Sequence, residues 1–337
     1  MSEGGLSYRD AGVDLDAAES AKNRLKDLVA RTRDANTLSE LGAFGGLYQV
    51  PDSKSPVLVS SADGVGTKLK VAFEAGRHDT VGQCLVNHCV NDILVQGARP
   101  MFFLDYLATG KMDETVVTEV VTGVAIACQE NACALLGGET AQMPDTYRAG
   151  AYDVAGTMIG VAERSALPRP ERVLVGDRIV GVAAVGPHTN GYSLARKTAA
   201  ALGPDYPVGS GTLAEALLAP HPSYYAELQA AFSTPGVRVV AHITGGGLEE
   251  NVPRVLPEGV GARFDVGTWA VPPVFDVIAA DQAVERREMY RIFNMGIGLA
   301  IVVAADEADA LLRAVPGSFQ AGEVVERSDP RVVLAGL

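Results

Sequence analysis

The run Asp63–Lys68 (DGVGTK) combines the residue types of a phosphate-binding loop. Its two glycines let backbone N–H groups approach an anion, Thr67 offers a hydroxyl, and Lys68 offers a positive charge. Asp63 could hold a divalent metal that bridges phosphate oxygens. The spacing matches neither a P-loop nor a dinucleotide-binding fingerprint, and Asp and Gly are also common in ordinary turns. The run therefore indicates phosphate chemistry without defining the class of enzyme.

A second polar group interrupts an apolar helix that the hydrophobic pattern predicts over residues 80–96. Asn91 and Asp92 lie there among Val, Cys, Ile and Leu, and a charged side chain in such surroundings needs a partner. His88 is four residues before Asp92 and therefore shares its helical face. Two interpretations stay open: a metal or triphosphate site, or a helix end whose polar groups are satisfied by nearby backbone.

Two further residues lie beside glycines at places where ligands often bind. Glu139 directly follows Gly137-Gly138, where we expect a strand to end. The alternative for Glu139 is an exposed loop carboxylate. His188 precedes Asn190-Gly191 and a predicted helix, so it could contact an anion or transfer a proton. An ordinary turn histidine is the alternative for His188.

The other histidines divide into one candidate and two without a recognisable partner. His242 precedes the glycine-rich loop Thr244–Gly247 at the start of a predicted helix, a place that suits a sugar phosphate. His78 and His221 belong to no such group, and we expect both on the surface or at helix ends.

The elements that must position these residues mix strands and helices in both halves of the chain, without strict alternation. This pattern predicts an α+β or mixed α/β fold rather than a doubly wound sheet. Residues 164–177 carry Pro168, Pro170 and several charges with little periodicity, so we expect two domains, 1–166 and 167–337. Strands are expected at 56–60, 101–107, 132–136, 153–161, 179–185, 237–243, 299–304 and 332–334, and helices at 16–33, 80–96, 113–130 with Asp113 as N-cap, 213–232, 271–284 and 308–314, with two more beginning at Tyr192 and Leu248.

Composition excludes several classes of function. Lys plus Arg is 28 and Asp plus Glu is 41, which gives a net charge of −13 and argues against nucleic-acid binding and against attachment to anionic lipid. We see neither a signal peptide nor an apolar stretch long enough to span a membrane, so we expect a cytoplasmic protein. The four cysteines occur in two pairs with four residues between the members, which favours buried hydrophobes over a zinc site.

Taken together, the motifs resemble the phosphoribosylformylglycinamidine cyclo-ligase family of purine biosynthesis over essentially the whole chain. The resemblance is carried by Ser7–Asp16, Asp63–Lys68, Val90–Asp92, Gln96–Ala98, Phe102–Tyr106, Gly137–Ala141, Gly186–Ser193, His242–Gly247 and Glu288–Asn294. It implies that ATP phosphorylates the formyl amide oxygen of formylglycinamidine ribonucleotide. A substrate nitrogen then attacks that carbon and expels phosphate, which gives aminoimidazole ribonucleotide and ADP.

The resemblance also implies a fold, partners and site residues. It implies two α/β domains, a homodimer that pairs its N-terminal sheets, ATP as co-substrate and Mg²⁺. By analogy, Asp63 and Asp92 are metal ligands, and Gln142 is not assigned because it stands where the family has Glu. The implied catalytic residues are Asp63, Lys68, Asp92, Glu139 and His188; the ATP contacts are Lys26, Gly64, Gly66, Thr67 and Lys68; and the substrate phosphate lies at Thr244, Gly245, Gly246 and Gly247.

Three related families and one other class of protein are the alternatives. A selenophosphate synthetase would carry a reactive cysteine near its N-terminus, whereas the first cysteine here is Cys84. The hydrogenase-maturation relative ends in a cysteine-bearing tail, and this chain ends in Ala335-Gly336-Leu337. A thiamine monophosphate kinase would lack the opening motif and the run at 289–291. A nucleotide-binding scaffold without activity would not need carboxylates at positions 63, 92 and 139.

Overall fold

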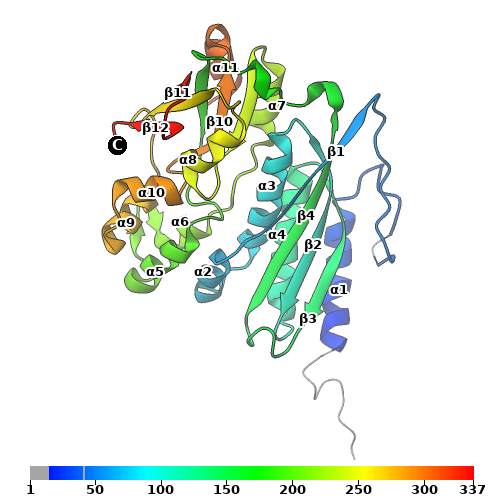
Figure 1. Ribbon diagram of the computed structural model, residues 1–337. Coiled ribbons are helices and arrows are strands. Elements are labelled where there is room, and N and C mark those ends of the chain that lie inside the picture. The colour runs from blue at the N-terminus through cyan, green and yellow to red at the C-terminus, as the bar shows by residue number, and fades with distance from the viewer. Residues whose placement is uncertain (1–14, 41) are drawn as a thin grey trace, which may run out of the picture.

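The computed structural model describes residues 15–40 and 42–337. The first half contains a four-stranded sheet made of β1 (Pro56–Gly64), β2 (Arg99–Thr109), β3 (Ala134–Gln142) and β4 (Tyr152–Glu163) (Figure 1). The strand order is β1-β4-β2-β3, with antiparallel pairing except between β2 and β3. Residues 7–14 of the predicted opening motif lie outside the described residues.

Helices cover one face of this sheet and leave the other face open (Figure 1). The covering helices are α1 (Leu15–Ala30), α3 (Asp79–Leu94) and α4 (Glu114–Glu130). Gly82 of α3 and Gly123 of α4 allow close packing, because a Cβ atom at either position would lie 2.1 Å from a carbonyl oxygen of the facing segment. The predicted N-cap of α4 is confirmed, since the Asp113 side chain accepts hydrogen bonds from the N–H groups of Thr115 and Val116.

The second half contains a six-stranded sheet in the order β12-β9-β11-β5-β10-β8, antiparallel apart from β12 and β9. Its strands are β5 (Arg178–Ala183), β8 (Val237–His242), β9 (Val260–Asp265), β10 (Ile297–Val303), β11 (Phe319–Glu326) and β12 (Val332–Ala335), and a small hairpin is formed by β6 (Pro207–Val208) and β7 (Gly211–Thr212). Its helices are α5 (Tyr192–Leu202), α6 (Leu213–Leu218), α7 (Tyr225–Ser233), α8 (Gly247–Asn251), α9 (Pro273–Gln282), α10 (Arg286–Ile292) and α11 (Ala308–Ala314).

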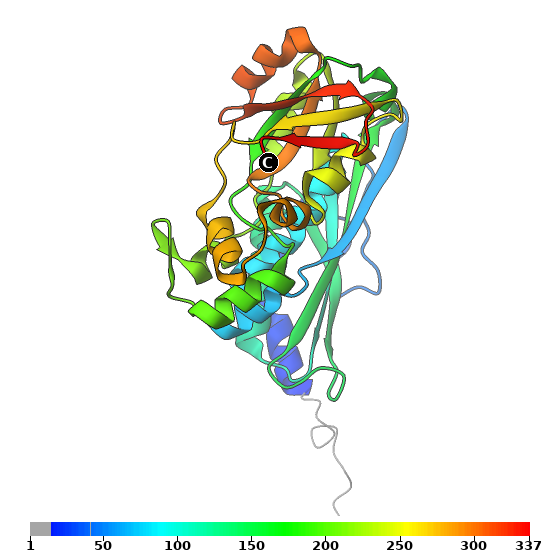
Figure 2. The same cartoon turned by 60° about the vertical axis from the view of Figure 1, so that its left-hand side comes forward.

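The two halves meet on the helical side of the first sheet. Helix α2 (Lys68–Ala75) packs against α5 and α6, and α3 packs against α7. Figures 1 and 2 show the second half lying along α2 and α3, away from the open face of the four-stranded sheet. Residues at the end of β1 and on α3 therefore face the loops of the second half.

The mixed α/β fold predicted from the sequence is confirmed, but two elements differ from expectation. Strand β3 does not end at Leu136: its pairing with β2 continues through Gln142, so Glu139 lies inside a strand. The predicted helix over 213–232 is broken into α6 and α7, because Pro220 and Pro222 cannot donate backbone hydrogen bonds within a helix. Among the described residues, no helix is long and apolar enough to cross a membrane.

Candidate active site

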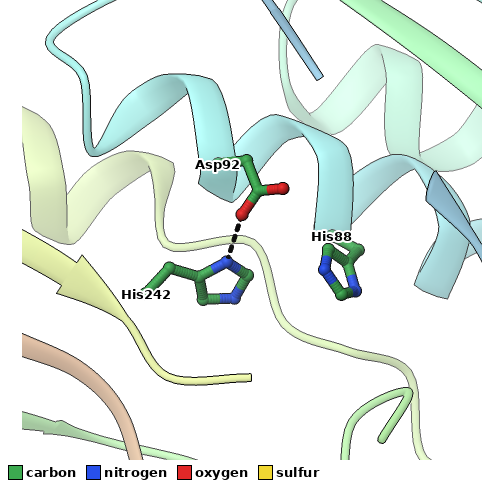
Figure 3. A group of neighbouring side chains, drawn as sticks. All are labelled: His88, Asp92 and His242. Carbon is green, nitrogen blue, oxygen red and sulfur yellow. Dashed lines mark hydrogen bonds and ion pairs between the residues drawn. The ribbon is translucent and has the colours of Figure 1, made fainter. Parts of the chain in front are cut away.

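Two acidic side chains of the first half meet histidines at the junction with the second half. Asp63 lies near the end of β1, and His88 and Asp92 lie one turn apart on α3. His242 ends β8 and points toward Asp92 (Figure 3). The junction thus brings together residues far apart in the sequence.

The Asp92 carboxylate is held from both halves of the chain. His242 Nδ1 lies 2.8 Å from Asp92 Oδ1 (Figure 3), and the Ser61 hydroxyl donates to Asp92 Oδ2 over 2.8 Å. Burial raises the pKa of Asp92, but the hydrogen bond from His242, together with His88 and Ser61, outweighs burial and leaves the pKa below its ordinary value. Because an ionised carboxylate only accepts hydrogen bonds, the Nδ1 atom of His242 carries a proton.

The Asp63 carboxylate is held in a similar way by His88. His88 Nε2 lies 2.9 Å from Asp63 Oδ2, and His88 Nδ1 lies 2.7 Å from the Thr189 hydroxyl of the second half. Burial lowers the pKa of His88, but Asp63 and Asp92 outweigh burial and raise it above its ordinary value. Burial raises the pKa of Asp63, yet the bond to His88 leaves it lowered. Each carboxylate is therefore held by a histidine, and His88 is shifted toward its charged form.

His221 and His188 form a neutral stack beside these pairs. The expectation that His221 lies on the surface or at a helix end is wrong, because it is fully buried and its ring stacks on His188 with centroids 4.0 Å apart. Burial lowers the pKa of both histidines well below the ordinary value. Neither ring nitrogen of His188 has a hydrogen-bond partner among the described residues. No spacing signal in the sequence links His221 to this group, because the link is made by tertiary packing.

Lys68 occupies a different place from the one its motif predicts. Its side chain is fully buried, and Nζ donates to the carbonyl oxygens of His188 (2.9 Å) and Ala219 (2.7 Å) and to Cys84 Sγ (3.1 Å). It also lies 5.4 Å from the centre of the Tyr192 ring. Since all three ammonium protons have acceptors, a contact with ATP would break bonds that join the two halves. The role of Lys68 as an ATP and catalytic cation stays a prediction, and it requires Nζ to leave at least one of these acceptors.

Glu139 and Lys26 lie apart from the carboxylate pairs within one chain. Glu139 pairs with Tyr106 of β2, and both side chains are exposed on the open face of the sheet, opposite to the face of Asp63. Its predicted place at a strand end is wrong because parallel pairing continues past it. Lys26 on α1 borders a hollow near Leu135 of β3, at the sheet edge opposite to β1. Neither residue is brought to Asp63 or Asp92.

The remaining predicted loops lie at the ends of elements that reach the junction. Gly64 ends β1, and the Gly66 φ of 64° places that residue in the left-handed region just before α2 begins. Thr67 is the N-cap of α2 and is half-buried. The first loop of the site therefore runs from the end of a strand to the start of a helix, as a phosphate-binding loop does.

The second glycine loop, Thr244–Gly247, joins β8 to α8. A Cβ atom at Gly245 would lie 2.9 Å from Asn190 Oδ1, so this loop contacts the turn that carries Thr189. The Asn251 amide donates to the carbonyl oxygens of Gly245 and Gly247 over 3.1 and 2.8 Å and fixes the loop.

The donor set fits a hard divalent cation better than a metal that prefers nitrogen. His88, Asp92 and His242 offer ligand atoms within 4.8 Å of one another. However, His88 bonds through both ring nitrogens, and His242 Nδ1 bonds Asp92. The Asp63 and Asp92 side chains are 40% and 35% exposed, so their oxygens keep accessible lone pairs. Carboxylate oxygens are ligands that Mg²⁺ prefers.

Comparisons with known proteins show the family of this chain. Residues 45–162 match the model of "AIR synthase related protein, N-terminal domain", and residues 175–335 match that of its C-terminal domain. The phosphoribosylformylglycinamidine cyclo-ligase of Trichlorobacter lovleyi is 46% identical over 324 residues, which are 94% of this chain and 93% of the relative. That of Paraburkholderia phymatum is 49% identical over 309 residues, which are 91% of this chain and 87% of the relative.

Solved structures show the same fold at low sequence identity. E. coli HypE aligns with a TM-score of 0.70 at 17% identity, covering 95% of this chain and 94% of that chain. Thiamine-monophosphate kinase from Stenotrophomonas maltophilia aligns with a TM-score of 0.68 at 19% identity, covering 93% and 96%.

Proposed function

The chain belongs to the phosphoribosylformylglycinamidine cyclo-ligase family of AIR synthase related proteins, and on that premise we propose how its junction performs the reaction. The activity is the ATP-dependent cyclisation of formylglycinamidine ribonucleotide to aminoimidazole ribonucleotide in purine biosynthesis. An amide oxygen is a poor leaving group and phosphate is a good one. ATP therefore phosphorylates that oxygen, and a substrate nitrogen displaces the phosphate from the carbon.

The observation that carries the site assignment is the pair of ionised carboxylates held by histidines at the junction. Asp63 and Asp92 would hold Mg²⁺, which offsets negative charge on the transferring phosphoryl group when it is bound. His88 and His242 orient these carboxylates through the 2.9 and 2.8 Å bonds. Preorganised ligands of this kind need no rearrangement during the reaction.

The glycine loops supply the remaining contacts of the proposal. The backbone N–H groups of residues 64–67 and the start of α2 would face the ATP phosphates. Thr244–Gly247 would bind the substrate phosphate, and its contact with Asn190 places it beside the turn that carries Thr189. Holding both substrates across the junction brings the attacking nitrogen and the activated carbon into reach of each other.

His188 is the candidate for moving a proton at the reacting end. Its ring is neutral because burial lowers its pKa, and its two nitrogens have no partner in the described structure. A neutral imidazole with a free nitrogen can accept the proton that the attacking substrate nitrogen loses.

The open face of the four-stranded sheet supports the expected homodimer. Leu58 is 61% exposed on β1, and Leu104 and Tyr106 are exposed on β2, so the face carries apolar side chains that a second sheet would cover. A hollow of about 400 Å³ on this sheet is bordered by Ala62, Leu104 and Tyr106 among others. Glu139 on the same face would then lie at the dimer interface, and Lys26 stays a candidate ATP contact near β3.

Two further expectations are carried forward as proposals. We place the division between the two domains at 166/167, in the segment between the last strand of the first sheet and β5. We also keep the cytoplasm as the proposed location, the usual place of small-molecule biosynthesis.

The test is ADP release measured against a panel of substrates. We expect ADP to form only with formylglycinamidine ribonucleotide and Mg²⁺ together, and not with thiamine monophosphate or selenide. Asp63→Asn and Asp92→Asn should each lower kcat by roughly 100-fold or more, because each removes a charged ligand of the metal. Unchanged turnover in a folded Asp63→Asn or Asp92→Asn variant would remove that residue from the mechanism.

A further inference from the structure

His221 is hydrogen bonded to three side chains of α3 that lie about one turn apart, Cys84, Asn87 and Asn91. Its backbone N–H donates to Cys84 Sγ over 3.3 Å, and its carbonyl accepts from the Asn87 amide over 2.8 Å. Its Nε2 atom lies 3.3 Å from the Asn91 amide nitrogen. Although His221 belongs to the segment between α6 and α7, its position is therefore fixed by the first half of the chain.

The His221 ring also meets His242 at the atom opposite to Asp92. His221 Nε2 lies 3.2 Å from His242 Nε2, and the ring centroids are 5.1 Å apart. A hydrogen bond between two ring nitrogens needs one proton and one lone pair. His242 Nδ1 meets Asp92 on the opposite side of the ring, so both nitrogens of His242 are held by a polar partner.

The Asn91 amide holds the same atom of His221. Asn91 Oδ1 accepts from the N–H of Tyr224 over 2.9 Å, which fixes the orientation of the amide, and its nitrogen donates to the carbonyl of Pro222 over 2.9 Å. That nitrogen carries a second proton and lies 3.3 Å from His221 Nε2. Contacts at its backbone and at Nε2 therefore keep the His221 ring beside His242.

We infer that His221 is a positioning residue for Asp92 and acts through His242. Because Asp92 holds Nδ1 and His221 holds Nε2, the His242 ring cannot rotate by half a turn without losing both contacts. His242 therefore keeps its Nδ1 proton on Asp92, and the carboxylate keeps one orientation toward the cation. This inference rests on the proposed role of Asp92 as a Mg²⁺ ligand.

The matched pair His221→Gln and His221→Met tests the hydrogen bond to His242. The two side chains are unbranched and similar in size, and both remove the ring stack on His188, but only Gln keeps a hydrogen-bonding group near the position of Nε2. His78→Gln is the control, since His78 is also buried and hydrogen bonds Tyr152, outside this network. The readouts are the ring ¹⁵N chemical shifts of His242 and the apparent KM for Mg²⁺ in ADP release.

We expect wild-type His242 to show a protonated Nδ1 and a single set of ring shifts, with no ligand added. In His221→Met the His242 shifts should move toward the average of two ring orientations, and the KM for Mg²⁺ should rise about tenfold, as for other outer partners of metal ligands. His221→Gln should keep the wild-type shifts and a KM within about threefold of wild type.

Two results would overturn the inference. One is a wild-type His242 that lacks a proton on Nδ1 or shows shifts averaged over two ring orientations, which needs no variant to fold. The other is His221→Gln and His221→Met with equal shifts and equal KM values while Asp92→Asn still raises the KM for Mg²⁺. If Asp92→Asn itself leaves the Mg²⁺ dependence unchanged, the proposed function of Asp92 fails instead, and the ¹⁵N result still decides whether His221 orients His242.

Discussion

Replacing Lys68 by Met separates the role that the sequence predicts from the role that the structure gives it. Met keeps the length and the apolar stem of the side chain and removes the ammonium. The carbonyls of His188 and Ala219, which accept from Nζ over 2.9 and 2.7 Å, would then lose that donor inside the junction.

The expected loss of stability follows from those two acceptors. An unsatisfied buried polar group costs about 1–3 kcal/mol, so two carbonyls amount to roughly 2–6 kcal/mol. The cation–π contact with Tyr192 adds about 1 kcal/mol, whereas removing a buried charge returns part of its desolvation cost. We expect a net decrease of about 2–4 kcal/mol in the free energy of unfolding.

The assay is urea unfolding followed by far-ultraviolet circular dichroism and by fluorescence of Trp269, the only tryptophan. Lys70→Met is the control, because Lys70 lies on the same helix and is exposed. The urea concentration at the unfolding midpoint should be lower for Lys68→Met than for the wild-type protein, and unchanged for Lys70→Met. A Lys68→Met protein with the wild-type midpoint but a strongly raised KM for ATP would refute this reasoning and restore the predicted ATP contact.

Three other predictions concern a glycine, the acid stability and the sheet face. Gly247→Ala should lower the free energy of unfolding by about 2–4 kcal/mol, because φ is 56° and the new Cβ atom would lie 2.1 Å from the Tyr290 carbonyl oxygen. Gly259→Ala is the control, because the space around Gly259 is open, and its urea unfolding should change little. Burial lowers the pKa of His221, so below pH 6.5 the unfolded chain binds a proton there that the folded protein does not. The free energy of unfolding of the wild-type protein should therefore fall as the pH drops toward 5, and His221→Met should reduce the slope of this fall by up to about 1.4 kcal/mol per pH unit. Equal slopes for the two proteins would show that His221 titrates normally. Leu58→Asp should shift light-scattering mass toward the monomer, and an unchanged dimer would exclude this face.

The parts of the site that could be predicted are those whose chemistry conflicts with their surroundings. Asp92 stands in an apolar helix, and its need for a partner was visible from its neighbours; the structure supplies His242 and Ser61. Asp113 was predictable as an N-cap because its role depends only on adjacent residues. His221 was not predictable, because its partners come from residues 84, 87, 91 and 242, and only the docking of the two halves brings them together.

The prediction failed where a glycine serves packing rather than a turn. Gly138 lies inside β3, beside Asp105 of β2. A Cβ atom at position 138 would lie 2.1 Å from Asp105 Oδ1, so the strand needs glycine there to leave room for that carboxyl. The Asp105 carboxyl is buried, and burial raises its pKa to about 7. Since local sequence cannot distinguish a packing glycine from a turn glycine, the strand end before Glu139 was misplaced.

The fate of the amide oxygen shows whether ATP activates the substrate before the ring closes. Formylglycinamidine ribonucleotide labelled with ¹⁸O in the formyl group is converted with ATP and Mg²⁺, and the released phosphate is analysed by mass spectrometry. We expect one ¹⁸O atom in each phosphate, because ATP phosphorylates that oxygen before the ring closes. Unlabelled phosphate from a complete turnover would contradict it.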